Sequence, residues 1–173
     1  MSNRRAFIAL GTNLPHQGVG GPALLARAIA ALKAGGLEPR ALSSIWETAA
    51  QPPSGQPNYF NACAELDCGH DTPQQLYAAL RTVEMRHGRV RRERWGARTL
   101  DLDILAMDDR VGVFDEITLP HARLHERAFV LCPLAEIAPA WRHPVLGKTV
   151  TELLSDLPPG QAAERVGAFP DPG

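Results

Sequence analysis

The chain contains the stretch Arg94-Trp95-Gly96-Ala97-Arg98-Thr99-Leu100-Asp101-Leu102-Asp103, in which an arginine-rich segment runs into a predicted strand. From Thr99 apolar and acidic residues alternate, so the leucines point to one face of the strand and Asp101 and Asp103 to the other. Residues i and i+2 of a strand lie about 6.6 Å apart. Two carboxylates at this spacing, beside several guanidinium groups, suit Mg²⁺ bound to a polyphosphate, because Mg²⁺ takes one or two carboxylates plus phosphate oxygens.

Each half of this stretch has a simpler explanation when it is taken alone. An Asp-x-Asp pair is common on solvated sheet faces, and an arginine run is most often surface or a nucleic-acid patch. Here the two halves are contiguous, with Trp95 and Gly96 between them. Glycine adopts backbone angles that other residues resist, and a Trp in a charged loop has no core to fill. Together the two halves favour a metal and phosphate site.

The remaining elements follow from apolar runs and turn residues on either side of this strand. The prediction comprises strands over Ala6–Leu10, Arg40–Thr48, Tyr59–Leu66, 99–107 and 111–114, and helices over 22–34, from the Thr72–Gln75 cap to Gly88, over Leu124–Ala138 and over Thr149–Ser155. The core order, strand-helix-strand-strand-helix-strand, is that of the ferredoxin-like, split βαβ fold of the α+β class. We expect an antiparallel sheet with helices on one face, in a single domain over residues 1–157, and a loosely ordered tail over 158–173.

The composition argues against some classes of function. The chain has 173 residues, 45% hydrophobic and 21% charged, with a formal net charge of −1, which argues against a general nucleic-acid binder. Positive charge is concentrated in residues 81–98, which hold seven arginines and two glutamates. No apolar run is long enough to cross a bilayer, and we expect neither a signal peptide nor a membrane partner.

The cysteines point to a reducing compartment. There are three, Cys63, Cys68 and Cys132, an odd number without C-x-x-C or zinc spacing. We interpret them as reduced thiols and expect a cytoplasmic protein.

Other motifs are less informative. Gly18–Ala23 matches G-x-G-x-x-A, but it is too far from the preceding strand for a dinucleotide-binding turn, so a flexible loop is favoured. His121 and His125 lack a third zinc ligand, and His121 is better explained as a phosphate donor near a helix start. Asn61 is either a turn residue or an amide that reads the edge of a heterocycle. For Glu84, taken alone, an ion pair with Arg81 or His87 is favoured.

Several ordered motifs resemble the 6-hydroxymethyl-7,8-dihydropterin pyrophosphokinase family. The resemblance extends from about Phe7 to about Val150. Its motifs are Ile8–Leu14, Gln56–Ala62, Glu84 with Gly88–Arg91, Arg94–Asp103, Leu119–His121, Arg127–Leu131, Pro133–Leu134 and Glu136–Pro139. The R-x-x-D-L-D core at Arg98–Asp103 is the most specific of them.

The resemblance implies an ATP-dependent enzyme of folate biosynthesis. It transfers the β,γ-diphosphate of ATP to the hydroxymethyl group of the pterin and releases AMP. By the resemblance, Asp101 and Asp103 hold two Mg²⁺ ions. Phosphate-binding and catalytic roles fall to Arg89, Arg98, His121 and Arg127, with Arg91 also on the nucleotide. Adenine is expected against the backbone of Ile104 and Leu105.

The resemblance also assigns the pterin site. Asn61 would read the edge of the pterin, Tyr59 and Phe129 would enclose its ring, and Thr48, Glu84 and Trp95 would line the site. The chain departs from the family pattern at Ala49–Pro53 and at Arg81, where some members have Gln near the adenine. A monomer is expected by resemblance.

Two other functions remain as alternatives. A non-catalytic nucleotide- or RNA-binding module would use aromatic residues on central strands for base stacking, and the sequence offers chiefly Tyr59 and Phe60. An ordinary kinase would transfer one phosphate and release ADP instead of AMP.

Overall fold

A six-stranded antiparallel sheet forms the centre of the computed structural model, which describes residues 4–50, 55–69, 71–88 and 99–173. The strands are β1 (Arg5–Thr12), β2 (Glu38–Leu42), β3 (Ile45–Thr48), β4 (Tyr59–Asp67), β5 (Asp101–Met107), β6 (Gly112–Phe114), β7 (Ile117–Leu119) and β8 (Glu164–Gly167). The helices are α1 (Gly21–Ala34), α2 (Pro73–Arg86), α3 (Ala128–Ile137) and α4 (Val150–Ser155), with a 3₁₀ turn at Leu124–Glu126.

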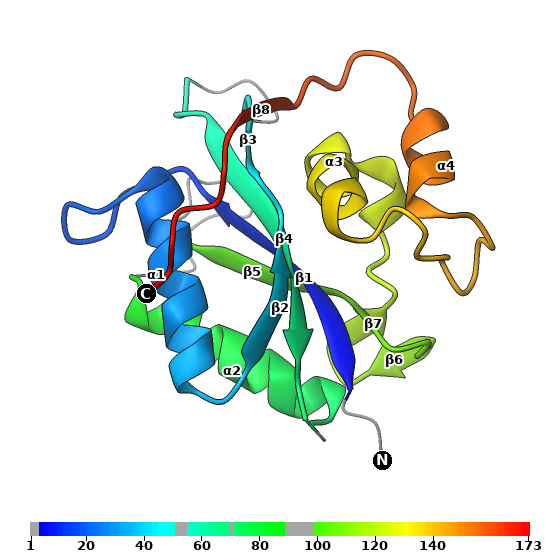
Figure 1. Cartoon of the computed structure of the whole chain (residues 1–173), viewed down its shortest axis with the longest axis horizontal. Helices are drawn as coiled ribbons and strands as arrows, with labels where there is room; N and C mark the ends of the chain where they lie inside the picture. The colour runs from blue at the N-terminus through cyan, green and yellow to red at the C-terminus, as the bar shows by residue number, and fades with distance from the viewer. Residues whose placement is uncertain (1–3, 51–54, 70, 89–98) are drawn as a thin grey trace.

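The strand order confirms the predicted ferredoxin-like class. Along the main sheet the order is β5-β1-β4-β3-β8, with β2 also paired to β4, while β6 and β7 form a separate hairpin. Every pairing is antiparallel. The first and third strands of the predicted core, β1 and β4, therefore lie side by side at the centre (Figure 1).

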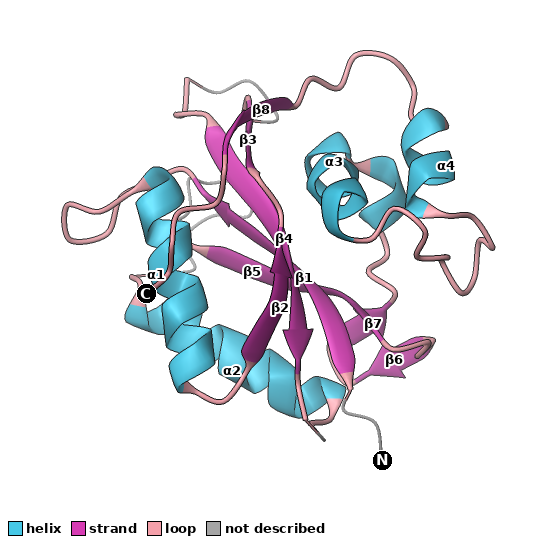
Figure 2. Ribbon diagram, in the orientation of Figure 1, coloured by secondary structure: helices cyan, strands magenta, loops and turns pink. Residues whose placement is uncertain are grey.

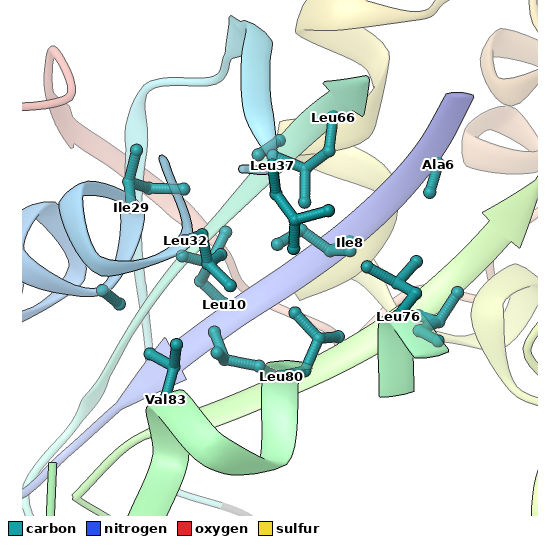
Figure 3. Close-up of a cluster of buried hydrophobic side chains, with 14 of the residues drawn as sticks. Ala6, Ile8, Leu10, Ile29, Leu32, Leu37, Leu66, Leu76, Leu80 and Val83 are labelled. Atoms are coloured by element: carbon teal, nitrogen blue, oxygen red, sulfur yellow. The ribbon is translucent and has the colours of Figure 1, made fainter. Parts of the chain in front are cut away.

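One face of the sheet builds the larger core. Alternate residues of β1, such as Ile8 and Leu10, are fully buried beneath α1 and α2 (Figure 3). Leu100 and Leu102 join the same core, as the alternation from Thr99 predicted. The caps of the helices are those expected from the sequence: Thr72 and Gln75 form a reciprocal capping box at the start of α2.

Helices cover both faces of the sheet, which corrects the expectation of helices on one face only. The intervening β1 residues Phe7 and Ala9, together with Cys63 of β4 and Leu105 of β5, pack in a second core against α3 and α4. Figure 2 shows α1 and α2 on one side of the sheet and α3 and α4 on the other. The physical reason is that central strands apolar on both faces require cover on both.

Two predicted elements are divided in the structure. The strand expected over Arg40–Thr48 is broken at Ser43, whose backbone N–H and hydroxyl both bond the backbone of Cys63, so β2 and β3 pair with β4 in succession. The helix expected over Leu124–Ala138 is interrupted at Arg127, whose backbone is extended between the 3₁₀ turn and α3.

The end of the chain is more ordered than expected. Residues Glu164–Gly167 form β8 along the outer edge of β3, and Phe169 packs against the larger core. The expectation of a loosely ordered tail over 158–173 is wrong for this part, because the free edge of β3 offers backbone hydrogen bonds that a short strand can satisfy. No helix among the described ranges has the length and hydropathy needed to cross a membrane.

Candidate active site

One row of side chains crosses the sheet on the face covered by α3. Asp101 of β5 lies opposite Gly11 of β1, Gly11 lies opposite Asn61 of β4, and Asn61 lies opposite Trp46 of β3. Directly paired residues share a face, so Asp101 and Asn61 face the same side with only a glycine between them. Since neighbouring strands lie about 4.8 Å apart, their Cα atoms are about 10 Å apart.

Asp103 occupies the next position on the same face. It lies opposite Ala9, which lies opposite Cys63. Gly11 and Ala9, which have little or no side chain, therefore separate both aspartates from β4. Both aspartates are intermediate in exposure, as expected for carboxylates that face a site and not the core.

Asn61 is held in a defined orientation. It is only 5% exposed, and its Nδ2 donates to Oγ1 of Thr48 at 2.9 Å. Its Oδ1 lies over Gly11, where an added Cβ would approach it to 3.2 Å. Tyr59 pairs with Thr48 at the adjoining end of β4. The predicted pterin residues Asn61, Thr48 and Tyr59 thus come together.

His121 is attached to the edge of β5. Its backbone N–H donates to the carbonyl of Leu105 at 2.8 Å, and its Nδ1 accepts the N–H of Arg123 at 3.1 Å. Burial lowers the pKa of His121, the positive charge of Arg127 lowers it further, and Asp101 partly opposes the shift. A neutral ring with Nδ1 as acceptor carries its hydrogen on Nε2, which makes it a donor.

Arg127 lies within the field of both aspartates. Burial lowers its pKa, as does the nearby Arg123, while Asp103 and Asp101 act in the opposite direction. Its guanidinium carbon is 5.4 Å from the ring centroid of Phe129 at the start of α3. The structure thus gathers Asp101, Asp103, His121 and Arg127, although about twenty residues separate the two pairs in sequence.

The sequence interpretation missed Arg123. Its charge acts on both His121 and Arg127, and its Nε donates to Glu126 at 3.1 Å. The signal available in the sequence was the alternation of basic residues at His121, Arg123, His125 and Arg127.

Glu84 lies on the other side of β5 from the aspartates. It is 1% exposed, its Oε1 lies 2.7 Å from Nη1 of Arg81, and its Oε2 accepts the backbone N–H of Leu102 at 2.9 Å. This geometry favours the ion pair with Arg81 over a direct contact with a pterin.

The expected adenine contacts are limited to the backbone. The Ile104 side chain belongs to the larger core and the Leu105 side chain to the second, and both are buried. Their side chains are therefore not available to a ligand, and contact of adenine with their backbone stays a prediction.

Four predicted site residues, Arg89, Arg91, Trp95 and Arg98, lie outside the described residues. The described residues on either side of this segment are Gly88 and Thr99. They are hydrogen-bonded, since Oγ1 of Thr99 donates to the carbonyl of Gly88 at 3.4 Å. Gly88, which follows α2, and Thr99, which precedes β5, therefore lie close together.

The donor set indicates the kind of metal that the site could hold. Within the described ranges no group of three or more His, Cys, Asp or Glu side chains forms a metal-binding cluster. Asp101 and Asp103 instead supply oxygen donors from one face of a strand. Two carboxylates without nitrogen or sulfur ligands suit a hard cation that shares its coordination with phosphate oxygens.

Comparison with known proteins shows the family of the chain. Residues 7–139 match the family model of 7,8-dihydro-6-hydroxymethylpterin-pyrophosphokinase (HPPK). A protein of Synechocystis sp. named 2-amino-4-hydroxy-6-hydroxymethyldihydropteridine pyrophosphokinase is 40% identical over 155 residues, which are 88% of this chain and 75% of the relative. A Pseudomonas aeruginosa protein of the same name is 37% identical over 161 residues, 90% of this chain and 93% of the relative.

Solved structures agree on the fold. Crystal structures of Plasmodium falciparum HPPK-DHPS match with a TM-score of 0.69 and 12% identity, over 89% of this chain and 45% of the solved chain. The chain thus spans less than half the length of these structures, and at this identity the likeness speaks for the fold alone. From the family match and the identity to its relatives, the chain belongs to the 7,8-dihydro-6-hydroxymethylpterin-pyrophosphokinase family.

Proposed function

We propose that the chain transfers the β,γ-diphosphate of ATP to the hydroxymethyl group of 6-hydroxymethyl-7,8-dihydropterin, releasing AMP, as a step of folate biosynthesis. Membership of the family supports this activity. The observation that carries it is the row Asp101, Gly11, Asn61, which puts a carboxylate and a buried amide on one sheet face about two strands apart. A compact substrate can reach both groups there.

The pterin binds at the Asn61 end of this row. The Asn61 amide offers a donor and an acceptor, as does the edge of a pterin, and Thr48 fixes the orientation of the amide. Tyr59 on β4 and Phe129 on α3 are the aromatic side chains assigned to enclose the ring, which favours stacking of a flat heterocycle. Trp95 is assigned to the same site. Glu84 is held by Arg81 and by the Leu102 N–H on the other side of β5, so we propose no direct contact between Glu84 and the pterin.

The triphosphate binds at the Asp101 end. Asp101 and Asp103 would hold two Mg²⁺ ions, because both offer carboxylate oxygens from one face of β5. When bound, the ions supply charge neutralisation on the bridging and leaving oxygens. His121 donates to a phosphate oxygen through Nε2, and Arg127 adds a guanidinium beside both carboxylates. Arg89, Arg91 and Arg98, which lie outside the described residues, are assigned to the phosphates by the family resemblance.

The chemistry requires positioning more than covalent help. The hydroxyl oxygen of the pterin forms a bond to the β-phosphorus of ATP, and the bond from that phosphorus to the α,β-bridging oxygen breaks. AMP leaves with the bridging oxygen, and the hydroxyl proton passes to solvent. The row of residues aligns the two substrates, while His121 and Arg127 stabilise charge on the transferred group.

The RNA-binding alternative requires a surface of aromatic side chains for base stacking, and Tyr59 and Phe60 do not form one. Tyr59 and Phe60 alternate on β4 and lie on opposite faces of the sheet, and Phe60 packs against the larger core. They therefore cannot form a shared stacking surface. The protein is expected to act in the cytoplasm as a monomer.

The deciding experiment is ³¹P NMR of the protein with ATP, Mg²⁺ and 6-hydroxymethyl-7,8-dihydropterin. AMP and a pterin diphosphate that require both the pterin and the metal would establish the reaction. ADP would mean transfer of a single phosphate, and would overturn the proposal. Absence of turnover by folded protein would also contradict it.

A further inference from the structure

Three residues of α2 face the outer edge of β5. Tyr77, Arg81 and Glu84 are spaced i, i+4 and i+7, which places them on one side of the helix. β5 is the end strand of the main sheet in the described structure, so its outer backbone groups have no strand partner there. At Leu102, α2 supplies these partners through side chains.

The contacts converge on one residue of β5, Leu102. Glu84 accepts the Leu102 N–H at 2.9 Å, and Nη2 of Arg81 donates to the Leu102 carbonyl. The two side chains are joined to each other at 2.7 Å. A single ion pair therefore holds both backbone polar groups of the residue that lies between Asp101 and Asp103.

The guanidinium group of Arg81 has a further contact, with the ring of Tyr77. Its guanidinium carbon lies 4.7 Å from the ring centroid of Tyr77, whose hydroxyl donates to Glu116 at 3.1 Å in the β6–β7 turn. Glu84 is 1% exposed, and the side chain of Arg81 is 21% exposed. Both ends of the ion pair are therefore held in one geometry.

A buried ion pair is seldom explained by stability alone, because apolar side chains of similar volume often stabilise a core at least as well. Here the pair offers what apolar residues cannot, namely an acceptor for the N–H and a donor for the carbonyl of Leu102. We propose that Arg81 and Glu84 are positioning residues, which fix the backbone at Leu102 and thereby set the relative placement of the Asp101 and Asp103 carboxylates. This inference rests on the proposed metal and ATP site.

Loss of this ion pair should change how the protein uses metal, in a way that is separable from folding. Arg81 and Glu84 belong to α2 and contact the backbone of β5, whereas the carboxylates lie on the sheet face covered by α3, so the pair acts through the strand and not by contact with the substrates. A loosened strand would weaken metal binding before it changed the chemistry. Supporting residues behind metal ligands typically change metal affinity about 10- to 100-fold when they are replaced.

The test compares three variants. Arg81→Gln removes one partner of the ion pair. The double variant Arg81→Met with Glu84→Met removes both partners and leaves no lone buried charge. The matched control is Arg86→Gln, which changes an exposed arginine of the same helix. Circular dichroism and thermal unfolding establish that each variant folds. The double variant keeps the test decisive if Arg81→Gln does not fold.

Two readouts are measured on each folded variant. The first is hydrogen exchange of the Leu102 amide in the metal-free protein. The second is the Mg²⁺ concentration for half-maximal AMP release, together with kcat at saturating Mg²⁺. We expect the Leu102 amide to exchange at least about 10-fold faster, and the half-saturating Mg²⁺ concentration to rise about 10-fold or more, with kcat nearly retained. Arg86→Gln should match the wild-type protein in both.

Unchanged Mg²⁺ dependence in the folded double variant would overturn the inference, as would a fall in kcat without a change in Mg²⁺ dependence. Mn²⁺ titration in the presence of ATP, followed by electron paramagnetic resonance, reads metal binding without turnover. Wild-type protein that makes no AMP would therefore refute the proposed function, while a difference in Mn²⁺ affinity between wild-type and double variant would still decide the positioning role.

Discussion

Gly11 of β1 and Asn61 of β4 are cross-strand partners, and an added Cβ on Gly11 would stand 3.2 Å from Oδ1 of Asn61. The backbone of Gly11 is not in the left-handed region, so the glycine is required by close approach and not by conformation. It also separates Asn61 from Asp101 in the row across the sheet. The absence of a side chain at residue 11 thus accommodates the amide and leaves no side chain between the two ends of the site.

Gly11→Ala should raise the KM for the pterin about 10-fold with a smaller effect on kcat, because the amide must shift by a few tenths of an ångström. Unfolding free energy should change by no more than about 1 kcal/mol, since alanine is otherwise acceptable in a strand. Steady-state kinetics with the pterin varied at saturating ATP measures the effect. The control is Gly167→Ala, a strand glycine with nothing within 4 Å of an added Cβ. Equal KM values for Gly11→Ala and wild type would show that the amide does not contact the pterin.

Thr48→Val removes the acceptor of the Asn61 Nδ2 bond while keeping the shape of the side chain. A buried amide N–H left without its partner costs about 1–3 kcal/mol, and the amide gains freedom to turn. We expect weaker pterin binding, measured by calorimetry with pterin and a non-hydrolysable ATP analogue. Thr48→Ser keeps the hydroxyl and should bind like wild type. Tight pterin binding by the valine variant would remove Thr48 from the site.

Asp101→Asn and Asp103→Asn should each lower the rate of AMP release by more than about 100-fold, because an amide cannot replace a carboxylate in charge neutralisation of Mg-ATP. Both side chains lie outside the cores, so thermal unfolding should remain close to wild type. Asp109→Asn, an exposed aspartate just beyond β5, is the control. A variant with full activity would exclude that aspartate as a metal ligand.

Most of the fold could be predicted from local sequence patterns. The alternation from Thr99 to Ile104 assigned each side chain to the correct face, and the Thr72–Gln75 cap fixed the start of α2, because both depend on residues close in sequence. The attachment of His121 to Leu105 and the capture of Leu102 by Arg81 and Glu84 depend on contacts between elements far apart in sequence. No periodicity in the chain encodes them.

The C-terminal strand was missed for a related reason. Four residues at 164–167 have no strong alternation, and they become a strand only because the edge of β3 is open. Arg165 then lies opposite Trp46, and its Nε donates to Ser44 at 2.8 Å. Glu136 of α3 accepts from Ser44 and from Trp46, which ties this edge to the helix above the site. Tertiary pairing therefore decided the structure of the tail.

Phe169→Ala should lower the unfolding free energy by about 1–3 kcal/mol, less than for a fully buried phenylalanine, because its ring is only partly buried against the larger core. Chemical denaturation measures the change. Val166→Ala is the control, since Val166 is 45% exposed on β8. If Phe169→Ala were as stable as wild type, the tail would contribute nothing to the core, and the expected loosely ordered tail would be the better description in solution.

The stability of the fold should fall as the pH drops below about 6.5, and His143 is a specific cause. Burial lowers the pKa of His143, and the neighbouring His125 lowers it further. In the folded protein its Nδ1 accepts the N–H groups of Val145 at 3.2 Å and Leu146 at 3.1 Å, which a protonated ring could not do. The unfolded chain takes up the proton first as the pH falls, so unfolding is favoured progressively below the ordinary histidine pKa.

His143→Asn tests this cause directly, because the Asn side chain can supply an oxygen acceptor in place of Nδ1 but does not titrate. Unfolding free energies of wild type and variant are compared between pH 7.5 and pH 5, and the curve of the variant should be flatter. Some slope should remain, since burial lowers the pKa of His121 in the same direction. An identical slope in both proteins would contradict the assignment, as would an NMR titration of folded wild type in which His143 protonates at its ordinary pKa. The neutral ring of His143 would then not be what holds the turn at Val145 and Leu146.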